Sequence, residues 1–156
     1  MSISDAPASP PLDLGGLPDL LGFQLRMAHV AMHRDFVTAM TDLGLTQKQF
    51  ASLRLIMANP GASQADLATI LGTDRATMMA LVDRLDQREF VERRRSTTDR
   101  RRQELYLTSA GKSFLVKVER VLDEHEKRFT SMFSDKELRA FIAALARMHG
   151  DRALTP

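Results

Sequence analysis

Six arginines lie within ten residues, from Arg93 to Arg102, and the only acidic residue among them is Asp99. The segment therefore carries a local charge of +5, whereas the net charge of the whole chain is only +2. Arginine stays charged at neutral pH, and its planar guanidinium group matches phosphate oxygens and the edges of nucleic-acid bases. This composition predicts a surface that binds a polyanion.

A second group of candidate contact residues lies at the start of an expected helix. Thr73 or Asp74 is suited to cap this helix, because short oxygen-bearing side chains accept hydrogen bonds from free backbone N–H groups. The next residues, 75–77, are arginine, alanine and threonine. Small hydroxyl groups and an arginine at a helix N-terminus can enter the major groove of DNA and meet base edges and phosphates.

Both groups lie on elements that the sequence pattern predicts. Strand-like runs at 90–92 and 105–107 flank the turn-forming sequence Ser-Thr-Thr-Asp at 96–99, which predicts a β-hairpin with an arginine-studded tip. Before it, a short helix over about 64–71, a glycine-containing turn and a second helix over 74–89 predict a helix-turn-helix. A hairpin after such a helix is typical of a winged helix, whose arginines can probe a narrow minor groove.

The remaining chain is expected to be helical apart from its beginning. Residues 1–17 are rich in proline and show little apolar periodicity, which predicts a flexible arm. Apolar residues at helical spacing predict a helix over 18–44 that ends at Gly44. Further helices are expected to begin at Thr46, Thr108 and Ser134. The expected fold class is therefore mainly α with a small β-hairpin wing.

Composition narrows the class of function. The 156 residues include no cysteine, which excludes disulfides, thiol nucleophiles, thiolate metal sites and thiol-based redox sensing. Common hydrolase and phosphate-binding motifs are absent from the sequence, so no enzyme activity and no cofactor are expected. No apolar run approaches membrane-spanning length and no secretory signal is found, so a cytoplasmic location is expected.

The sequence from about Thr46 to Gly111 contains a series of short motifs. They are Ser63-Gln64-x-x-Leu67-Ala68, Leu71-Gly72-Thr73-Asp74-Arg75-Ala76-Thr77, Leu81-Val82-Asp83-Arg84-Leu85, Asp99-Arg100-Arg101 and Leu105-x-Leu107-Thr108-x-x-Gly111. In these motifs the sequence resembles the MarR (multiple-antibiotic-resistance regulator) family of bacterial winged-helix repressors, and the expected flanking helices also fit the family layout. It departs from the family at Ala80, where a basic or polar residue is frequent, and at Phe90, which follows Glu89 and stands at the position of a usual glycine.

The resemblance implies a dimeric transcriptional repressor. Helices within 18–44 and 109–152 would form a dimerisation region, and two winged helices (46–108) would straddle a pseudo-palindromic operator in double-stranded DNA. Asp99 would brace the wing and Arg101 would reach into the minor groove. The expected DNA-binding residues are Ser63, Gln64, Thr73, Asp74, Arg75, Ala76, Thr77, Arg84, Arg95, Asp99, Arg100, Arg101 and Arg102.

The resemblance also implies a small effector that changes the affinity for DNA. Aromatic acids, phenols and acyl compounds are common effectors in this family, and an aromatic anion requires an apolar slot with a few cationic or hydrogen-bonding groups. For His29 and His33, the alternative to ligand contact is that they are packed or partly exposed. A zinc site would need a further ligand cluster, for which His125 is a candidate, so no metal ligand is assigned. The candidate effector-binding residues are His29, His33, Phe36, Phe50 and Arg54.

Two further alternatives remain open at the level of sequence. A winged helix can bind an acidic protein instead of DNA, although the hydroxyl- and arginine-bearing helix start at 73–77 favours DNA. Arginines 93–95 could contact phosphates without selecting a sequence, and basic runs are often only solvated surface. Met78 is expected in the core, whereas Met79 either packs inside or touches thymine methyl groups.

Overall fold

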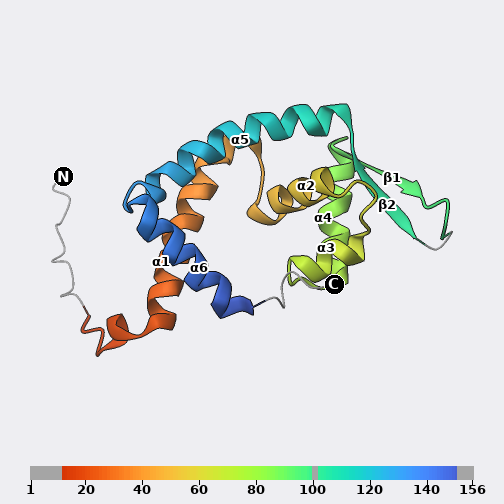
Figure 1. Ribbon diagram of the computed structural model, residues 1–156. Helices are drawn as coiled ribbons and strands as arrows, with labels where there is room; N and C mark the ends of the chain where they lie inside the picture. Colours follow the sequence, from red (N-terminus) through yellow and green to blue (C-terminus); the bar gives the residue numbers. More distant parts are fainter. Residues whose placement is uncertain (1–11, 100–101, 151–156) are drawn as a thin grey trace, which may run out of the picture. The chain divides into compact units, whose positions relative to one another are not determined.

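The computed structural model describes residues 12–99 and 102–150 and is mainly helical (Figure 1). Strands β1 (Val91–Arg95) and β2 (Gln103–Leu107) form an antiparallel hairpin between the fourth and fifth α-helices. The predicted fold class, mainly α with a β-hairpin wing, is confirmed. Most of the expected arm lies outside the described residues. The α-helices are α1 (Leu21–Ala39), α2 (Gln47–Ala58), α3 (Gln64–Ile70), α4 (Arg75–Gln87), α5 (Ser109–Thr130) and α6 (Asp135–His149).

The helix expected over 18–44 is shorter than predicted, because 3-10 turns replace both of its ends. Leu17–Asp19 form the first turn, and extended backbone at Leu20 (φ −88°, ψ 125°) separates it from α1. The second turn covers Thr41–Leu43. Gly44 ends the helical segment as predicted, since its left-handed backbone (φ 56°) suits a residue without a side chain.

Local hydrogen bonds explain where the later helices begin. Thr46, Ser63 and Ser134 each form a capping box with the residue three positions on, in which side chain and backbone satisfy each other reciprocally. Asp74 caps α4 and Thr108 caps α5. The expected helix starts are thereby confirmed, and Asp74 is the cap that the sequence left open between residues 73 and 74.

The junction between α4 and the hairpin requires an unusual backbone. α4 ends slightly earlier than expected, and Glu89 then adopts a left-handed φ of 58°. The Phe90 N–H donates to the Leu85 carbonyl at 3.0 Å, and the Phe90 carbonyl accepts from the Thr108 N–H at 3.1 Å. A Cβ atom on Gly111 would lie only 2.1 Å from the Phe90 carbonyl oxygen, so the first turn of α5 depends on glycine there.

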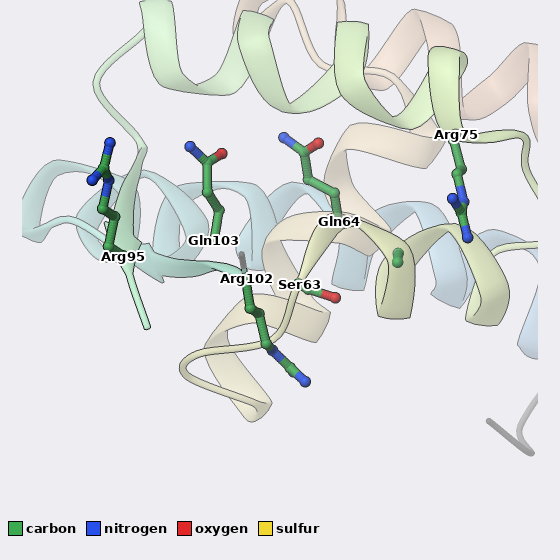
Figure 2. Close-up of a pocket in the computed structure, with 7 residues that line it drawn as sticks. Ser63, Gln64, Arg75, Arg95, Arg102 and Gln103 are labelled. Atoms are coloured by element: carbon green, nitrogen blue, oxygen red, sulfur yellow. The ribbon is translucent and has the colours of Figure 1, made fainter. Parts of the chain in front are cut away.

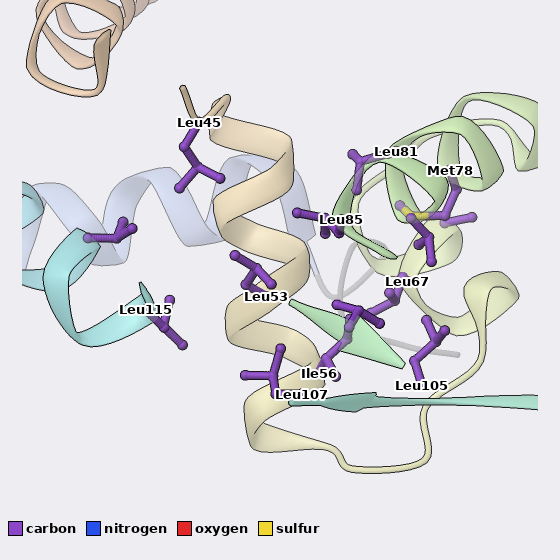
Figure 3. Close-up of a cluster of buried hydrophobic side chains, with 14 of the residues drawn as sticks. Leu45, Leu53, Ile56, Leu67, Met78, Leu81, Leu85, Leu105, Leu107 and Leu115 are labelled. Carbon is purple, nitrogen blue, oxygen red and sulfur yellow. The ribbon is translucent and has the colours of Figure 1, made fainter. Parts of the chain in front are cut away.

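The core of the winged helix lies among α2, α3, α4 and β2 (Figure 3). Side chains from these elements interdigitate with almost no exposure to solvent, which fixes the starts of α3 and α4 relative to the base of the hairpin. Residues that are at most 1% exposed include Leu53, Ile56, Leu67, Met78, Val82, Leu85 and Leu105.

The arginine-rich segment is not confined to the tip of the hairpin, contrary to the prediction. Arginines 93–95 lie in β1, where they pair with residues 103–105 of β2. The Ser96 N–H donates to the Arg102 carbonyl at 3.0 Å and closes the connecting loop. Turn formation begins only at Ser96, because its hydroxyl accepts from backbone N–H groups further along the turn while the arginines before it continue the strand.

Candidate nucleic-acid interface

A concave surface lies at the starts of α3 and α4 and at the base of the hairpin, and it encloses a cavity with a volume of about 650 Å³. Arginines of α4, β1 and the residue before β2 line it, and no acidic residue is among the lining residues that the structure describes. A surface of this kind attracts a polyanion. Figure 2 shows the lining side chains, which belong to Ser63, Gln64, Ala65, Arg75, Arg95, Arg102 and Gln103.

The start of α4 combines a rigid cap with exposed contact groups. The two carboxylate oxygens of Asp74 accept hydrogen bonds from Thr77, from its N–H at 2.8 Å and from its hydroxyl at 2.6 Å. The hydroxyl first and the N–H second hold the pKa of Asp74 below its usual range. Arg75, Ala76 and Thr77 are exposed, so this helix end can be approached by a large ligand.

The remaining candidates on and before α4 lie in different environments. The hydroxyl oxygen of Thr73 is buried, whereas Arg84 is exposed in the last turn of α4, away from the other candidates. Met78 is fully buried as predicted. Met79 is 52% exposed, so it does not pack in the core of this chain.

The start of α3 is linked to the hairpin by an ion pair. Asp66 Oδ2 accepts from the Ser63 N–H and hydroxyl, both at 2.8 Å, and from a guanidinium N–H of Arg102, also at 2.8 Å. The hydrogen bond from the Ser63 N–H is the main cause that lowers the pKa of Asp66, and the Arg102 charge adds to it. Arg102 is thus one of the expected DNA-binding residues and also a partner of α3.

Two further arginines of the hairpin also have partners within the chain, and sequence reasoning missed both. Arg93 forms ion pairs with Asp83 and Asp86 of α4. Arg94 pairs with Glu92, and its guanidinium carbon lies 4.4 Å from the centre of the Tyr106 ring. Side chains alternate between the two faces of a strand, and acidic residues lie on the neighbouring helix. These two features could have indicated that some of the strand arginines form ion pairs.

The other wing candidates are placed as follows. Arg95 is exposed and lines the concave surface. Asp99 is exposed, and its carbonyl accepts from the Arg102 N–H at 2.9 Å. Arg100 and Arg101 lie outside the described residues.

The candidate effector-binding residues are dispersed among several environments. His29 and His33 are exposed on α1, with their rings stacked at a centroid distance of 5.9 Å. Phe36 is only 2% exposed and belongs to the core, and Phe50 packs against that core. Arg54 pairs with Glu119 of α5, and its side chain is 56% exposed. Its apolar neighbours in sequence face inward, whereas Arg54 itself faces solvent.

A buried histidine forms a polar group that sequence reasoning did not find. His125 of α5 is 2% exposed, and its Nδ1 lies 2.6 Å from Asp35 Oδ2 at the end of α1. The other oxygen of Asp35 accepts from Arg128 at 2.8 Å. Phe36 and Phe129 contact the imidazole with their rings edge-on. The Asp35 carboxylate therefore joins the end of α1 to His125 and Arg128 of α5.

Within residues 12–99 and 102–150, no group of three or more histidine, aspartate or glutamate residues is placed to hold a metal ion. None of the helices in these ranges is long and apolar enough to cross a membrane.

Comparison with known proteins identifies the family. Residues 45–102 match the family model described as the MarR family. The chain is also 33% identical over 143 residues to a putative transcriptional regulatory protein for the hcr operon of Thauera aromatica, covering 91% of this chain and 86% of that protein. The chain belongs to the MarR family.

Solved structures of MarR-type repressors share this fold. The repressor CouR bound to a 23-mer DNA duplex matches 90% of the chain and 100% of that structure, with a TM-score of 0.86 and 34% identity. CouR bound to p-coumaroyl-CoA matches 89% of the chain and 98% of that structure, with a TM-score of 0.80 and 32% identity. The protein is therefore a transcriptional regulator of the MarR type and not an enzyme, as the sequence predicted.

Proposed function

We propose that the protein is a homodimeric repressor that binds a pseudo-palindromic operator through paired winged helices and leaves it when a small aromatic or acyl effector binds. The observation that carries the proposal is the concave surface lined by Arg75 and Arg95, whose lining includes no acidic residue among those that the structure describes. A duplex offers closely spaced phosphates to such a surface, while the exposed start of α4 is free to enter the major groove.

The proposed DNA contacts divide between the two grooves. Arg75, Ala76 and Thr77 would meet base edges and phosphates in the major groove, and Arg95 with Arg101 would reach the adjacent minor groove. Asp74 would act as the cap that presents this helix end. The other expected DNA-binding residues, Ser63, Gln64, Thr73, Arg84, Asp99 and Arg100, would support or extend these contacts.

The apolar surface of α6 supports the homodimer. None of its residues is buried within one protomer, yet Phe141, Ile142 and Met148 are 43%, 57% and 54% exposed. Apolar side chains repeated on one helix normally lie against another surface. Pairing of two copies would bury this face and set two winged helices about one turn of DNA apart.

The CouR complex with p-coumaroyl-CoA supports the choice of an aromatic acyl effector. The candidate residues His29, His33, Phe36, Phe50 and Arg54 offer aromatic surface and cationic or polar groups for such a ligand. We expect Arg54→Ala to retain operator binding but to need more p-coumaroyl-CoA for release. Glu119→Gln removes the partner of Arg54 and serves as the matched control. Loss of folding or dimerisation in Arg54→Ala would show that Arg54 is structural.

Fluorescence anisotropy tests the proposed function directly. The full-length protein is titrated into the duplex upstream of its own gene at several salt concentrations, with random duplex as competitor. Selective binding that weakens steeply with salt is expected, because bound arginines release counterions from the phosphates. Binding no stronger than to random duplex would favour the alternative of an acidic protein partner for the arginine hairpin.

A further inference from the structure

Arg102 lies between two concave surfaces and turns away from the other arginine of the wing. Figure 2 shows its side chain directed to the opposite side from Arg95 and Gln103. On that side it lines a second, smaller cavity of about 330 Å³ at the end of α2 and along α3, which Asp66 also lines. The guanidinium group therefore meets a carboxylate of the protein rather than open solvent alone.

Asp66 is a well-fixed partner for this guanidinium group. The carboxylate oxygen that Arg102 contacts also accepts both hydrogen bonds from Ser63 in the capping box of α3. These bonds hold the carboxylate at the start of α3, which itself is anchored in the core by Leu67. An ion pair with a fixed partner requires less ordering of side chains than one between two mobile groups.

The backbone of Arg102 is tied to the loop of the hairpin at the same time. Its N–H donates to the Asp99 carbonyl at 2.9 Å, and its carbonyl accepts from the Ser96 N–H at 3.0 Å. A force on the Arg102 side chain is thus transmitted to both sides of the loop. Gln103, the residue after Arg102, lines the larger surface and pairs across the hairpin with Arg95, which lines the same surface.

We infer that Arg102 is a positioning residue, which holds the hairpin against α3 through Asp66 and so orients Arg95 toward the DNA. It has this role in place of a direct phosphate contact. The DNA readout of this inference rests on the proposed function, whereas the coupling of hairpin and α3 does not. The ion pair also neutralises a carboxylate that would otherwise lie beside the path of the phosphates.

The DNA test compares Arg102→Gln, Asp66→Asn and the double variant. Asparagine retains an oxygen for both Ser63 hydrogen bonds, so Asp66→Asn removes the charge but keeps the cap. We expect each single variant to lower the ratio of operator to random-duplex affinity about two- to five-fold, the range of exposed ion pairs. The double variant should be no worse than either single variant, because both remove one interaction.

Arg94→Gln is the matched control for the loss of a wing charge. Arg94 is exposed and pairs with Glu92, but it does not line either cavity. Its replacement should leave the ratio of affinities unchanged. In Arg102→Gln the slope of log affinity against log salt should also stay at its wild-type value, whereas loss of a phosphate contact would lower it by about one.

A second measurement tests the coupling without DNA. The chain has no cysteine, so Thr97→Cys accepts a single trifluoromethyl label on the exposed loop of the hairpin. We expect the fluorine resonance to move or broaden in the same way in Arg102→Gln, Asp66→Asn and the double variant, and to stay unchanged in Arg94→Gln.

The possible outcomes separate this inference from the proposed function. An unchanged fluorine resonance in Arg102→Gln and Asp66→Asn overturns the positioning role whatever the DNA results are. A lower salt slope with equal losses on operator and random duplex also overturns it and identifies a phosphate contact. If the label responds as expected but the wild-type protein binds no duplex selectively, the coupling stands and the proposed function fails.

Discussion

The winged helix and α6 differ in the burial of their apolar residues. In the winged helix, Leu53, Val82 and Leu105 come from three different elements and are completely buried within one protomer. In α6, Phe141, Ile142 and Met148 lie on a capped helix but remain exposed. A similar apolar pattern on a helix can therefore specify an internal core or a surface that needs a partner. The two outcomes differ in how many other elements of the same protomer pack against the apolar residues.

The largest expected effect follows from placing a charge on the α6 surface. Ile142→Glu should dissociate the proposed dimer, because a carboxylate cannot be buried without a partner. Operator affinity should then fall about a hundredfold or more, since the second winged helix no longer binds as part of the same particle. Analytical ultracentrifugation and anisotropy measure both effects.

Met57→Glu is the corresponding control on the winged helix. Met57 is 48% exposed on α2, close to the exposure of Ile142. This variant should remain dimeric. If Ile142→Glu remains dimeric, the exposed apolar residues of α6 do not form the dimer contact, and that contact lies elsewhere.

The next largest effect concerns the close packing between the winged helix and the first turn of α5. Gly111→Ala should lower the free energy of unfolding by about 3 kcal/mol, the upper range for overpacking, because the added methyl group would overlap the Phe90 carbonyl. Urea denaturation measures the loss. Gly22→Ala on α1 is the control, since the added Cβ would meet no atom within 4 Å among the described residues outside its own helical backbone, and alanine favours a helix. Equal behaviour of the two variants would contradict the close approach at Gly111.

A moderate effect is expected for DNA contact at the start of α4. Arg75→Ala should weaken operator binding by about 1–3 kcal/mol if the arginine meets a base edge or phosphate there. Its fold and dimer should be unchanged, because the side chain is exposed. Arg120→Ala, an exposed position on α5, removes the same charge as a control. Equal losses for both variants would mean that only net charge matters.

The sequence predicted the winged helix well because its signals are local. Capping boxes at Thr46 and Ser63, the cap at Asp74 and the turn after Ser96 each depend on residues a few positions apart, and all of them form. Helical periodicity likewise placed Met78 in the core.

The sequence could not predict which arginines have partners inside the chain. Arg93 meets Asp83 and Arg102 meets Asp66 only after the hairpin folds back onto α4 and α3. Arg54 similarly finds Glu119, which is 65 residues away. These contacts depend on distances between elements that no local pattern specifies, so a basic run by itself did not show which charges remain available to DNA.

A smaller effect should come from the backbone of Glu89. Glu89→Gly should raise the free energy of unfolding by about 0.5 kcal/mol, because relief of a left-handed conformation slightly exceeds the added entropy of glycine in the unfolded chain. Thermal and urea unfolding both measure this gain. Glu89→Ala, which keeps a Cβ, is the control. Destabilisation by glycine alone would mean that the left-handed conformation is not strained.

The smallest expected effects compare the caps of the two regions under acid. Hydrogen bonds from Thr77 lower the pKa of Asp74 on α4, and those from Ser134 lower the pKa of Glu137 on α6. A carboxyl group with a lowered pKa stabilises the fold above its pKa in the unfolded chain, and this contribution disappears as pH falls through the lower folded value. Both caps should therefore weaken on acidification below about pH 4.

Asp74→Asn and Glu137→Gln should each flatten the pH dependence of the unfolding free energy in acid, because an amide does not titrate. Thr77→Val keeps the Asp74 carboxyl but removes the hydroxyl that lowers its pKa most, so the pKa should rise toward the usual aspartate value. Carbon-13 NMR titration of the side-chain carboxyl groups measures each pKa directly. An Asp74 that titrates alike in the wild type and in Thr77→Val would show that the hydroxyl does not bind the carboxylate and that the two regions cap their helices differently.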